Sequence, residues 1–125
     1  MITLGIELSS RQGSVALLKN GGLLAEKTWC GENVRHGILF ERMEQLLAEA
    51  GVSYSDISLY AVGRGPGSFF GMRMAFAAAQ ALALPGKTAV RAVSSGAALA
   101  LAAAHGTGAE QIAVQFQHLV AAGAA

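Results

Sequence analysis

Short apolar runs separated by turn residues make up the first 30 positions of the chain. Their period and their β-favouring side chains predict strands over Ile2–Leu8, Ser14–Lys19 and Gly22–Trp29. Between the second and third runs, Asn20-Gly21 favours the positive φ angles of a type I′ turn. Because the connections are this short, the pattern predicts an antiparallel meander.

From residue 36 onward, helical periods alternate with short apolar runs. Apolar side chains recur at helical spacing over His36–Ala50, and Gly51 follows as a C-terminal stop. The later pattern predicts strands over Leu59–Gly63 and Thr88–Val93, helices over about Ser68–Leu84 and from Ser94 or Ser95 to about His105, and a sixth strand over Ile112–Gln117.

This element order, βββαβα(βα), predicts an α/β fold with a mixed five-stranded sheet. Helices between the later strands imply crossover connections, so those strands are expected to be parallel. The order is that of a ribonuclease H-like half-domain, which actin-like ATPases use in pairs with nucleotide between them. The length of 125 residues fits one such unit. We expect residues 1–105 to form it, and residues 106–125 to be a tail or the start of a truncated second half-domain.

Composition narrows the class of protein further. Hydrophobic residues make up 53% of the chain and charged residues 14%, which argues against disorder. The net charge of +1, without a run of Lys or Arg, gives no electrostatic signal for direct nucleic-acid binding. The longest apolar stretch, Met74–Pro85, is shorter than the roughly 20 residues that span a bilayer, and no basic leader opens the sequence. We therefore expect a cytoplasmic protein without a membrane partner.

A glycine-rich stretch, GRGPGSFFGMR over residues 63–73, carries the candidate chemistry. It follows a predicted strand and opens a predicted helix, where backbone N–H groups can bind phosphate. It lacks the Gly-Lys-Ser/Thr ending of a P-loop and the register of a Rossmann fingerprint. The alternative is a sharp turn in which Gly65 and Gly67 supply special backbone angles, Ser68 caps the helix and Gly71 allows close packing. Spacing favours the turn, and Arg73 lies one helical turn further on.

Other catalytic and metal-binding patterns find little support. The three histidines lie far apart, without the spacing of a metal site. A protease would need Ser, His and Asp together, and the spacing of Ser68 and His36 does not indicate this. Glu7 is an acidic residue in an apolar strand, where burial would require a partner.

Four stretches resemble the TsaB (YeaZ-type) family. GRGPGSFFGMR resembles the family signature G-x-G-P-G-S-F-T-G-x-R, which is quite specific. The resemblance extends from residue 2 to about residue 104, through ITLGIELSSRQGSVALL, RHGILFERMEQLLAEAGVSYSDIS and VSSGAALALAAA.

The resemblance implies an actin-like protein that has lost catalysis. TsaB proteins pair with an ATP-using paralogue, TsaD, and with the ATPase TsaE the complex transfers a threonylcarbamoyl group to the tRNA adenosine beside the anticodon. The chain would then be a scaffold and activator that reaches tRNA only through the complex. No cofactor is expected on this chain, whereas ATP and metal are expected on the TsaD-type partner. The family once carried a glycoprotease label.

The chain departs from the family pattern in its first loop and in its glycine signature. The usual Asp-Thr-Ser reads Glu7-Leu8-Ser9 here, and the signature Thr is Phe70. In active members of the superfamily the acidic position helps hold metal and nucleotide, so the longer Glu makes binding less expected. We therefore predict no catalytic residue and no metal ligand, but a vestigial phosphate loop made of Gly65, Gly67, Ser68, Gly71, Arg73, Glu7 and Ser9.

The predicted helices over residues 36–50 and 68–84 are apolar around more of their circumference than a sheet-covering helix requires. The excess predicts either a fully buried helix or a contact with another protein, to which Met side chains adapt well. The resemblance implies a four-helix contact with TsaD or with a second copy. The candidate partner surface consists of His36, Phe40, Met43, Leu47, Met72, Phe76 and Ala79.

Two alternatives stay open on the sequence alone. One is an enzyme, either an actin-like nucleotide-dependent phosphotransferase or a peptidase remnant. The other is an inactive truncated fragment. A metal-binding constellation or a complete second half-domain would favour the enzyme, and the sequence shows neither.

Overall fold

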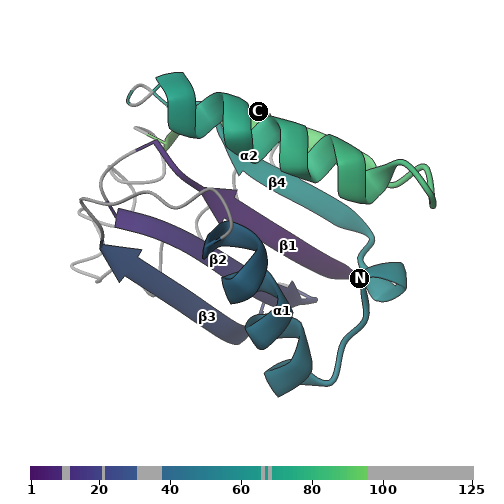
Figure 1. Cartoon of the computed structure of the whole chain (residues 1–125). Helices are drawn as coiled ribbons and strands as arrows, with labels where there is room; N and C mark the ends of the chain where they lie inside the picture. Colours follow the sequence, from purple (N-terminus) through teal and green to yellow (C-terminus); the bar gives the residue numbers. More distant parts are fainter. Residues whose placement is uncertain (10–11, 21, 31–37, 66, 68, 96–125) are drawn as a thin grey trace.

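The computed structural model describes residues 1–9, 12–20, 22–30, 38–65, 67 and 69–95. A five-stranded sheet has the order β3-β2-β1-β4-β5. Figure 1 shows β3, β2, β1 and β4 side by side. The antiparallel pairs are β1 with β2 and β2 with β3, whereas β4 and β5 run parallel to β1. The strands are β1 (Ile2–Glu7), β2 (Gln12–Lys19), β3 (Gly22–Cys30), β4 (Leu59–Gly63) and β5 (Ala89–Val93).

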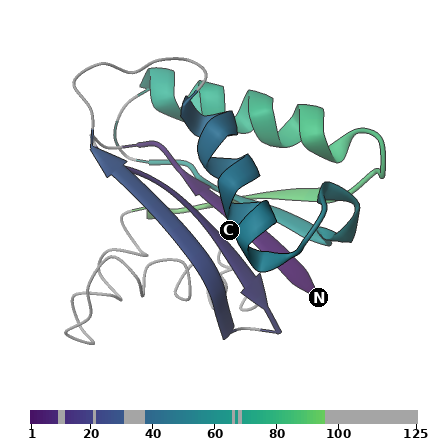
Figure 2. The ribbon, with the colours of Figure 1, turned by 60° about the horizontal axis from the view of Figure 1, so that its bottom comes forward.

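Two helices cover one face of this sheet (Figures 1 and 2). Helix α1 (Ile38–Ala50) packs on β2 and β3, and α2 (Phe69–Ala83) packs on β4, β5 and β1. A short 3₁₀ turn, η1 (Tyr54–Asp56), lies between α1 and β4. None of the described helices has both the length and the apolar character needed to cross a bilayer.

The core fills the layer between the helices and the sheet. Every second residue of β1, β2 and β4 points toward the helices, because successive side chains of a strand point to opposite faces of the sheet. Each helix contributes one stripe of side chains at helical spacing. The fully or nearly buried members include Leu4, Ile6, Val15, Leu17, Leu39, Met43, Leu46, Tyr60, Val62, Ala75 and Ala79.

Predicted turn residues are found with the expected geometry. Asn20 follows β2 with a φ of 53°, as the predicted hairpin turn requires. Gly51 has a φ of 66°, and the N–H of Val52 donates to the carbonyl of Leu47, which ends α1 with a left-handed cap. Both positions confirm the prediction from the sequence.

The ribonuclease H-like arrangement predicted from the element order is confirmed in the described residues. The ends of the described strands and α-helices lie within two residues of the predicted ends. The third helix beyond residue 95, the sixth strand at Ile112–Gln117 and the tail from residue 106 lie outside the described residues.

Candidate functional site

The parallel strands bring three chain segments together at one edge of the sheet. β1 ends at Glu7, β4 at Gly63 and β5 at Val93, and the register pairs Ile6 with Val62 and Gly63 with Val93. Ligands of parallel sheets bind outside the carboxyl ends of their strands. The predicted phosphate loop begins at this edge, so its surroundings are the first candidate site.

The Glu7 carboxylate connects these segments. Its Oε1 accepts hydrogen bonds from the backbone N–H of Ser9, at 2.8 Å, and from the Ser9 hydroxyl. Its Oε2 accepts a hydrogen bond from the Ser95 hydroxyl at 2.6 Å. Ser95 Oγ in turn accepts one from the Gly65 N–H at 3.1 Å, and the Ser95 N–H donates to the Gly65 carbonyl. We call Glu7, Ser9, Gly65 and Ser95 the Glu7 clamp.

Glycines make room for the clamp. A Cβ at Gly63 would lie 2.0 Å from Glu7 Oε2, so any side chain there would take the place of the carboxylate. A Cβ at Gly67 would lie 2.1 Å from the Ser9 carbonyl oxygen, which is backbone and cannot move aside easily. Gly65 and Gly67 have φ angles of 85° and 156°, which confirms the prediction that they supply special backbone angles.

The polar groups of the clamp are used in hydrogen bonds with one another. The Ser9 and Ser95 hydroxyls donate their protons to Glu7, and the N–H of Gly65 is used by Ser95. No group of at least three His, Cys, Asp or Glu side chains gathers anywhere in the described ranges. Hard cations take several oxygen ligands, and in the described part of this corner both carboxylate oxygens of Glu7 already accept hydrogen bonds from Ser9 or Ser95.

Two further loop candidates, Gly71 and Arg73, lie on α2. Gly71 is buried on α2, and the Arg73 guanidinium lies 5.6 Å from the centre of the Phe69 ring on an exposed part of the helix. Ser68 lies outside the described residues. The structure therefore brings Glu7, Ser9, Gly65 and Gly67 together, whereas Arg73 lies on the exposed side of α2.

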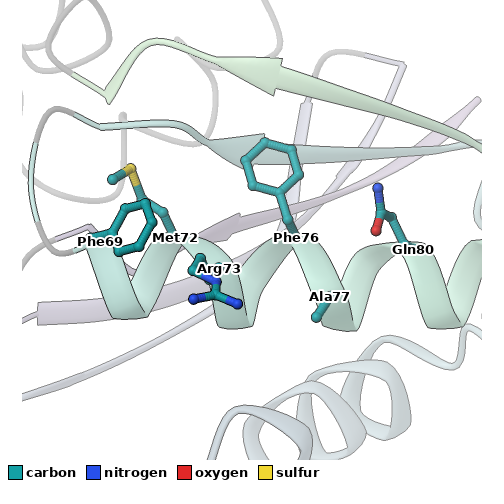
Figure 3. Close-up of a pocket in the computed structure, with 6 residues that line it drawn as sticks. All are labelled: Phe69, Met72, Arg73, Phe76, Ala77 and Gln80. Atoms are coloured by element: carbon teal, nitrogen blue, oxygen red, sulfur yellow. The ribbon is translucent and has the colours of Figure 1, made fainter.

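A second candidate surface follows the exposed side of α2. Six side chains at helical spacing line an open groove of about 380 Å³, and Figure 3 shows them along one helix. Phe69, at the start of this groove, is 70% exposed. We call this surface the α2 groove; it consists of Phe69, Met72, Arg73, Phe76, Ala77 and Gln80.

Part of the predicted partner surface has to be corrected. Met43, Leu47 and Ala79 are buried in the core, because they lie on the helix stripes that face the sheet. They therefore do not lie on an exposed face. Phe40 is 42% exposed. The list of candidates for a partner contact thus shrinks to Phe40, Met72 and Phe76, to which the groove adds Phe69; His36 lies outside the described residues.

Sequence reasoning missed two members of the corner. Ser95 was expected only at the start of a predicted helix. Gly63 ends a predicted strand and opens the glycine-rich stretch, but it was given no role in the site. A polar residue directly after β5 and a glycine at the end of β4 are the signals that could have indicated them, because the parallel strand ends converge there.

Comparison with known proteins places the chain in a family. The model of the TsaD family, described as tRNA N6-adenosine threonylcarbamoyltransferase, matches residues 36–120. The Escherichia coli tRNA threonylcarbamoyladenosine biosynthesis protein TsaB is 38% identical over 84 residues, which are 67% of this chain and 36% of that protein. The chain belongs to the TsaD family and is a TsaB-type protein.

Other TsaB-type relatives agree with this assignment. The Haemophilus influenzae protein of the same name is 34% identical over 103 residues, covering 80% of this chain and 42% of that protein. The structure of YeaZ from Pseudomonas aeruginosa matches with a TM-score of 0.73 at 37% identity, over 79% of this chain and 46% of that chain. The chain thus spans less than half the length of these relatives.

A more distant structure supports the fold alone. RuvC from Thermus thermophilus matches with a TM-score of 0.52 at 16% identity, over 90% of this chain and 75% of that chain. Together with the YeaZ match, this agrees with the ribonuclease H-like half-domain seen in the strand order.

Proposed function

We propose that this TsaB-type chain is a non-catalytic subunit of a tRNA-modifying complex. It pairs with a TsaD-type paralogue and activates the threonylcarbamoylation of the tRNA adenosine beside the anticodon. The names of its relatives support the pathway, since they are called tRNA threonylcarbamoyladenosine biosynthesis proteins.

The hydrogen bonds of the Glu7 carboxylate support the proposal that this chain is not catalytic. Both of its oxygens accept hydrogen bonds from the chain's own donors, Ser9 and Ser95. A carboxylate that holds a metal or positions a nucleotide needs lone pairs directed toward that ligand. At the carboxyl ends of the parallel strands, Glu7 instead ties the glycine loop to β1 and to the segment after β5.

The α2 groove supports the partner part of the proposal. Apolar patches of this kind on a protein surface mark interaction sites, and aromatic, Met and Arg side chains are enriched in the centres of interfaces. The groove contains all of these types. ATP and metal are proposed to bind the TsaD-type partner, a TsaE-type ATPase completes the complex, and tRNA is reached only through it. Without the partner, we expect a second copy of the chain to use the same surface.

Two binding measurements on the 125-residue chain test this proposal. We expect a tagged chain to capture the TsaD-type paralogue of the same organism from a mixture of the purified proteins. Calorimetry with Mg-ATP should give no dissociation constant tighter than about 1 mM, roughly −4 kcal/mol. Micromolar ATP binding to the chain alone, or no capture of the paralogue, would overturn the proposal.

A further inference from the structure

The Glu7 carboxylate lies in surroundings typical of a bound anion. It accepts from one backbone N–H and two hydroxyls, which belong to Ser9 and Ser95. These neutral donors come from residues that are far apart in sequence, and they converge on one carboxylate. Backbone N–H groups and hydroxyls arranged in this way at strand ends are the usual means of holding a small anion.

The space around the carboxylate is shaped by a missing side chain. The Cβ that residue 63 lacks would lie 2.0 Å from Glu7 Oε2 and 2.6 Å from the Glu7 carboxyl carbon. The carboxyl group therefore occupies volume that the neighbouring strand leaves open. Shortening the side chain at position 7 would leave this volume and its three donor groups without an occupant.

Ser95 connects the carboxylate in this space to the glycine loop. Ser95 Oγ donates to Glu7 and accepts from the Gly65 N–H, so one hydroxyl joins the carboxylate to the loop. The Ser95 N–H and the Gly65 carbonyl add a second bond between the same two residues. A carboxylate in this place fixes the direction of the Ser95 hydroxyl proton and leaves its lone pairs for Gly65.

We infer that Ser9, Ser95 and Gly63 form an anion cradle that the chain fills with its own Glu7 carboxylate, and that the emptied cradle binds a small free carboxylate. The filled cradle holds the glycine loop in its conformation. Glu7 is thus a positioning residue, a built-in ligand that closes this edge of the sheet to external anions. The inference does not depend on the proposed function, and its test involves neither the partner nor tRNA.

The test removes the carboxylate and returns it as a free ion. Glu7→Ala deletes a CH₂–COO⁻ group, and acetate supplies the same atoms. In sodium chloride, Glu7→Ala should melt at least about 10 °C below the original chain, because several hydrogen bonds to a charged group are lost. At equal ionic strength, acetate should restore at least half of that difference and formate less. The exposed Glu44→Ala variant and the original chain should show no difference between acetate and chloride.

Nuclear magnetic resonance locates the effect. The amide resonances of Ser9 and Gly65 in Glu7→Ala should move toward their original positions as acetate is added. Glu7→Gln, whose amide fills the cradle, should not respond to acetate. Equal melting of Glu7→Ala and the original chain, equal stabilisation of all variants by acetate, or a response of Glu7→Gln would each overturn the inference.

A second variant covers the case in which Glu7→Ala does not fold even in acetate. Ser95→Ala keeps Glu7 and both Ser9 donors but removes the hydroxyl that joins the carboxylate to the Gly65 N–H. It should shift the Gly65 amide resonance strongly and leave the Ser9 amide resonance in place. An unshifted Gly65 amide would show that the carboxylate does not hold the loop.

Discussion

The Glu7 clamp and the α2 groove differ in how their side chains are used. The polar groups of the clamp bond to one another, whereas the apolar side chains of the groove are accessible to solvent. In the clamp, both carboxylate oxygens of Glu7 accept hydrogen bonds from Ser9 or Ser95. In the groove, large apolar side chains remain accessible, with Phe69 at 70% exposure. One region is closed by internal bonds, whereas the other is open to contact.

This arrangement differs from that of most proteins with an open α/β sheet. In open α/β sheets the strand ends carry the ligand site and the helices cover the sheet. Here the strand ends are held together by Glu7, and one covering helix presents an apolar stripe. The contrast agrees with the proposed role of a subunit that acts through protein contact, and each prediction below tests one side of it.

Gly67→Ala should have the largest effect on stability. The new Cβ would lie 2.1 Å from the Ser9 carbonyl oxygen, and the φ of 156° is unfavourable for a side chain. Steric overlap with backbone and strain together should lower the free energy of unfolding by about 3 kcal/mol or more. Urea denaturation followed by circular dichroism measures this quantity.

Gly22→Ala is the matched control for that substitution. Its new Cβ would have an ordinary contact at 3.5 Å, so the same change of residue type should shift stability by less than about 1 kcal/mol. Equal stability of Gly67→Ala and the original chain would mean that the close approach to Ser9 has no structural role.

Phe69→Asp should weaken partner binding without destabilising the fold. Phe69 is exposed and begins α2, where an acidic side chain interacts favourably with the helix dipole. Loss of an aromatic contact residue should raise the dissociation constant for the TsaD-type partner about 30-fold, or 2 kcal/mol. Met72 is a poorer choice, because its sulfur would lie 2.6 Å from a Cβ at Gly65 and a change there would also disturb the loop.

Leu84→Asp provides the comparison for Phe69→Asp. Leu84 is 77% exposed and follows α2 outside the groove. The Leu84→Asp variant should bind the partner as tightly as the original chain does. If the two variants lose binding equally, or neither loses any, the α2 groove is not the contact surface.

Tyr60→Phe should leave stability unchanged or raise it by up to about 1 kcal/mol. Tyr60 is fully buried, and its hydroxyl has no hydrogen-bond partner within the described part of the chain. Removing a buried hydroxyl without a partner eliminates a desolvation cost and loses no bond. A clear loss of stability in urea denaturation would show that the hydroxyl has a partner, and would weaken the contrast with the fully bonded clamp.

The change in stability at alkaline pH tests the burial of the Tyr60 hydroxyl. Burial, and to a smaller extent the charge of Tyr54, raise the pKa of Tyr60 above its ordinary value. The unfolded chain therefore loses this proton at a lower pH than the folded chain does. The stability that this group contributes is complete below about pH 10 and is lost as the pH rises further. The free energy of unfolding of Tyr60→Phe should therefore decrease less steeply with pH in this range than that of the original chain.

Lys27→Ala should have the smallest effect. Its Nζ lies 2.6 Å from Glu49 Oε1 and joins β3 to α1, but the two side chains are 28% and 56% exposed. An ion pair so accessible to water contributes at most about 0.5 kcal/mol. A loss above 1 kcal/mol in urea denaturation would indicate that this pair stabilises the α1 packing more than its exposure suggests.

Most of the fold could be predicted because it depends on local signals. The period of apolar residues indicated each described strand and both α-helices, and Gly51 marked the end of α1. The partner surface was harder, because periodicity indicates that a helix has an apolar stripe without indicating what covers it. Met43 and Leu47 were therefore assigned to a partner although the sheet buries them.

The corner could be predicted only in part. Glu7, Ser9 and the loop glycines were singled out from the glycine signature and the first loop. Ser95 was not, because it lies 88 residues from Glu7 and meets it only after β1, β4 and β5 have paired. A hydrogen bond over this separation follows from strand register, which a single sequence does not specify directly.

The most direct test of the account is the rate of tRNA threonylcarbamoylation in a mixture of purified TsaD-type and TsaE-type proteins with this chain. Two folded variants are compared with the original chain: Glu7→Gln alters the clamp, and Phe69→Asp alters the groove. We predict that Glu7→Gln supports the reaction at close to the original rate, whereas Phe69→Asp at the same concentration supports little of it. The opposite pattern, with Glu7→Gln inactive and Phe69→Asp active, would contradict the account.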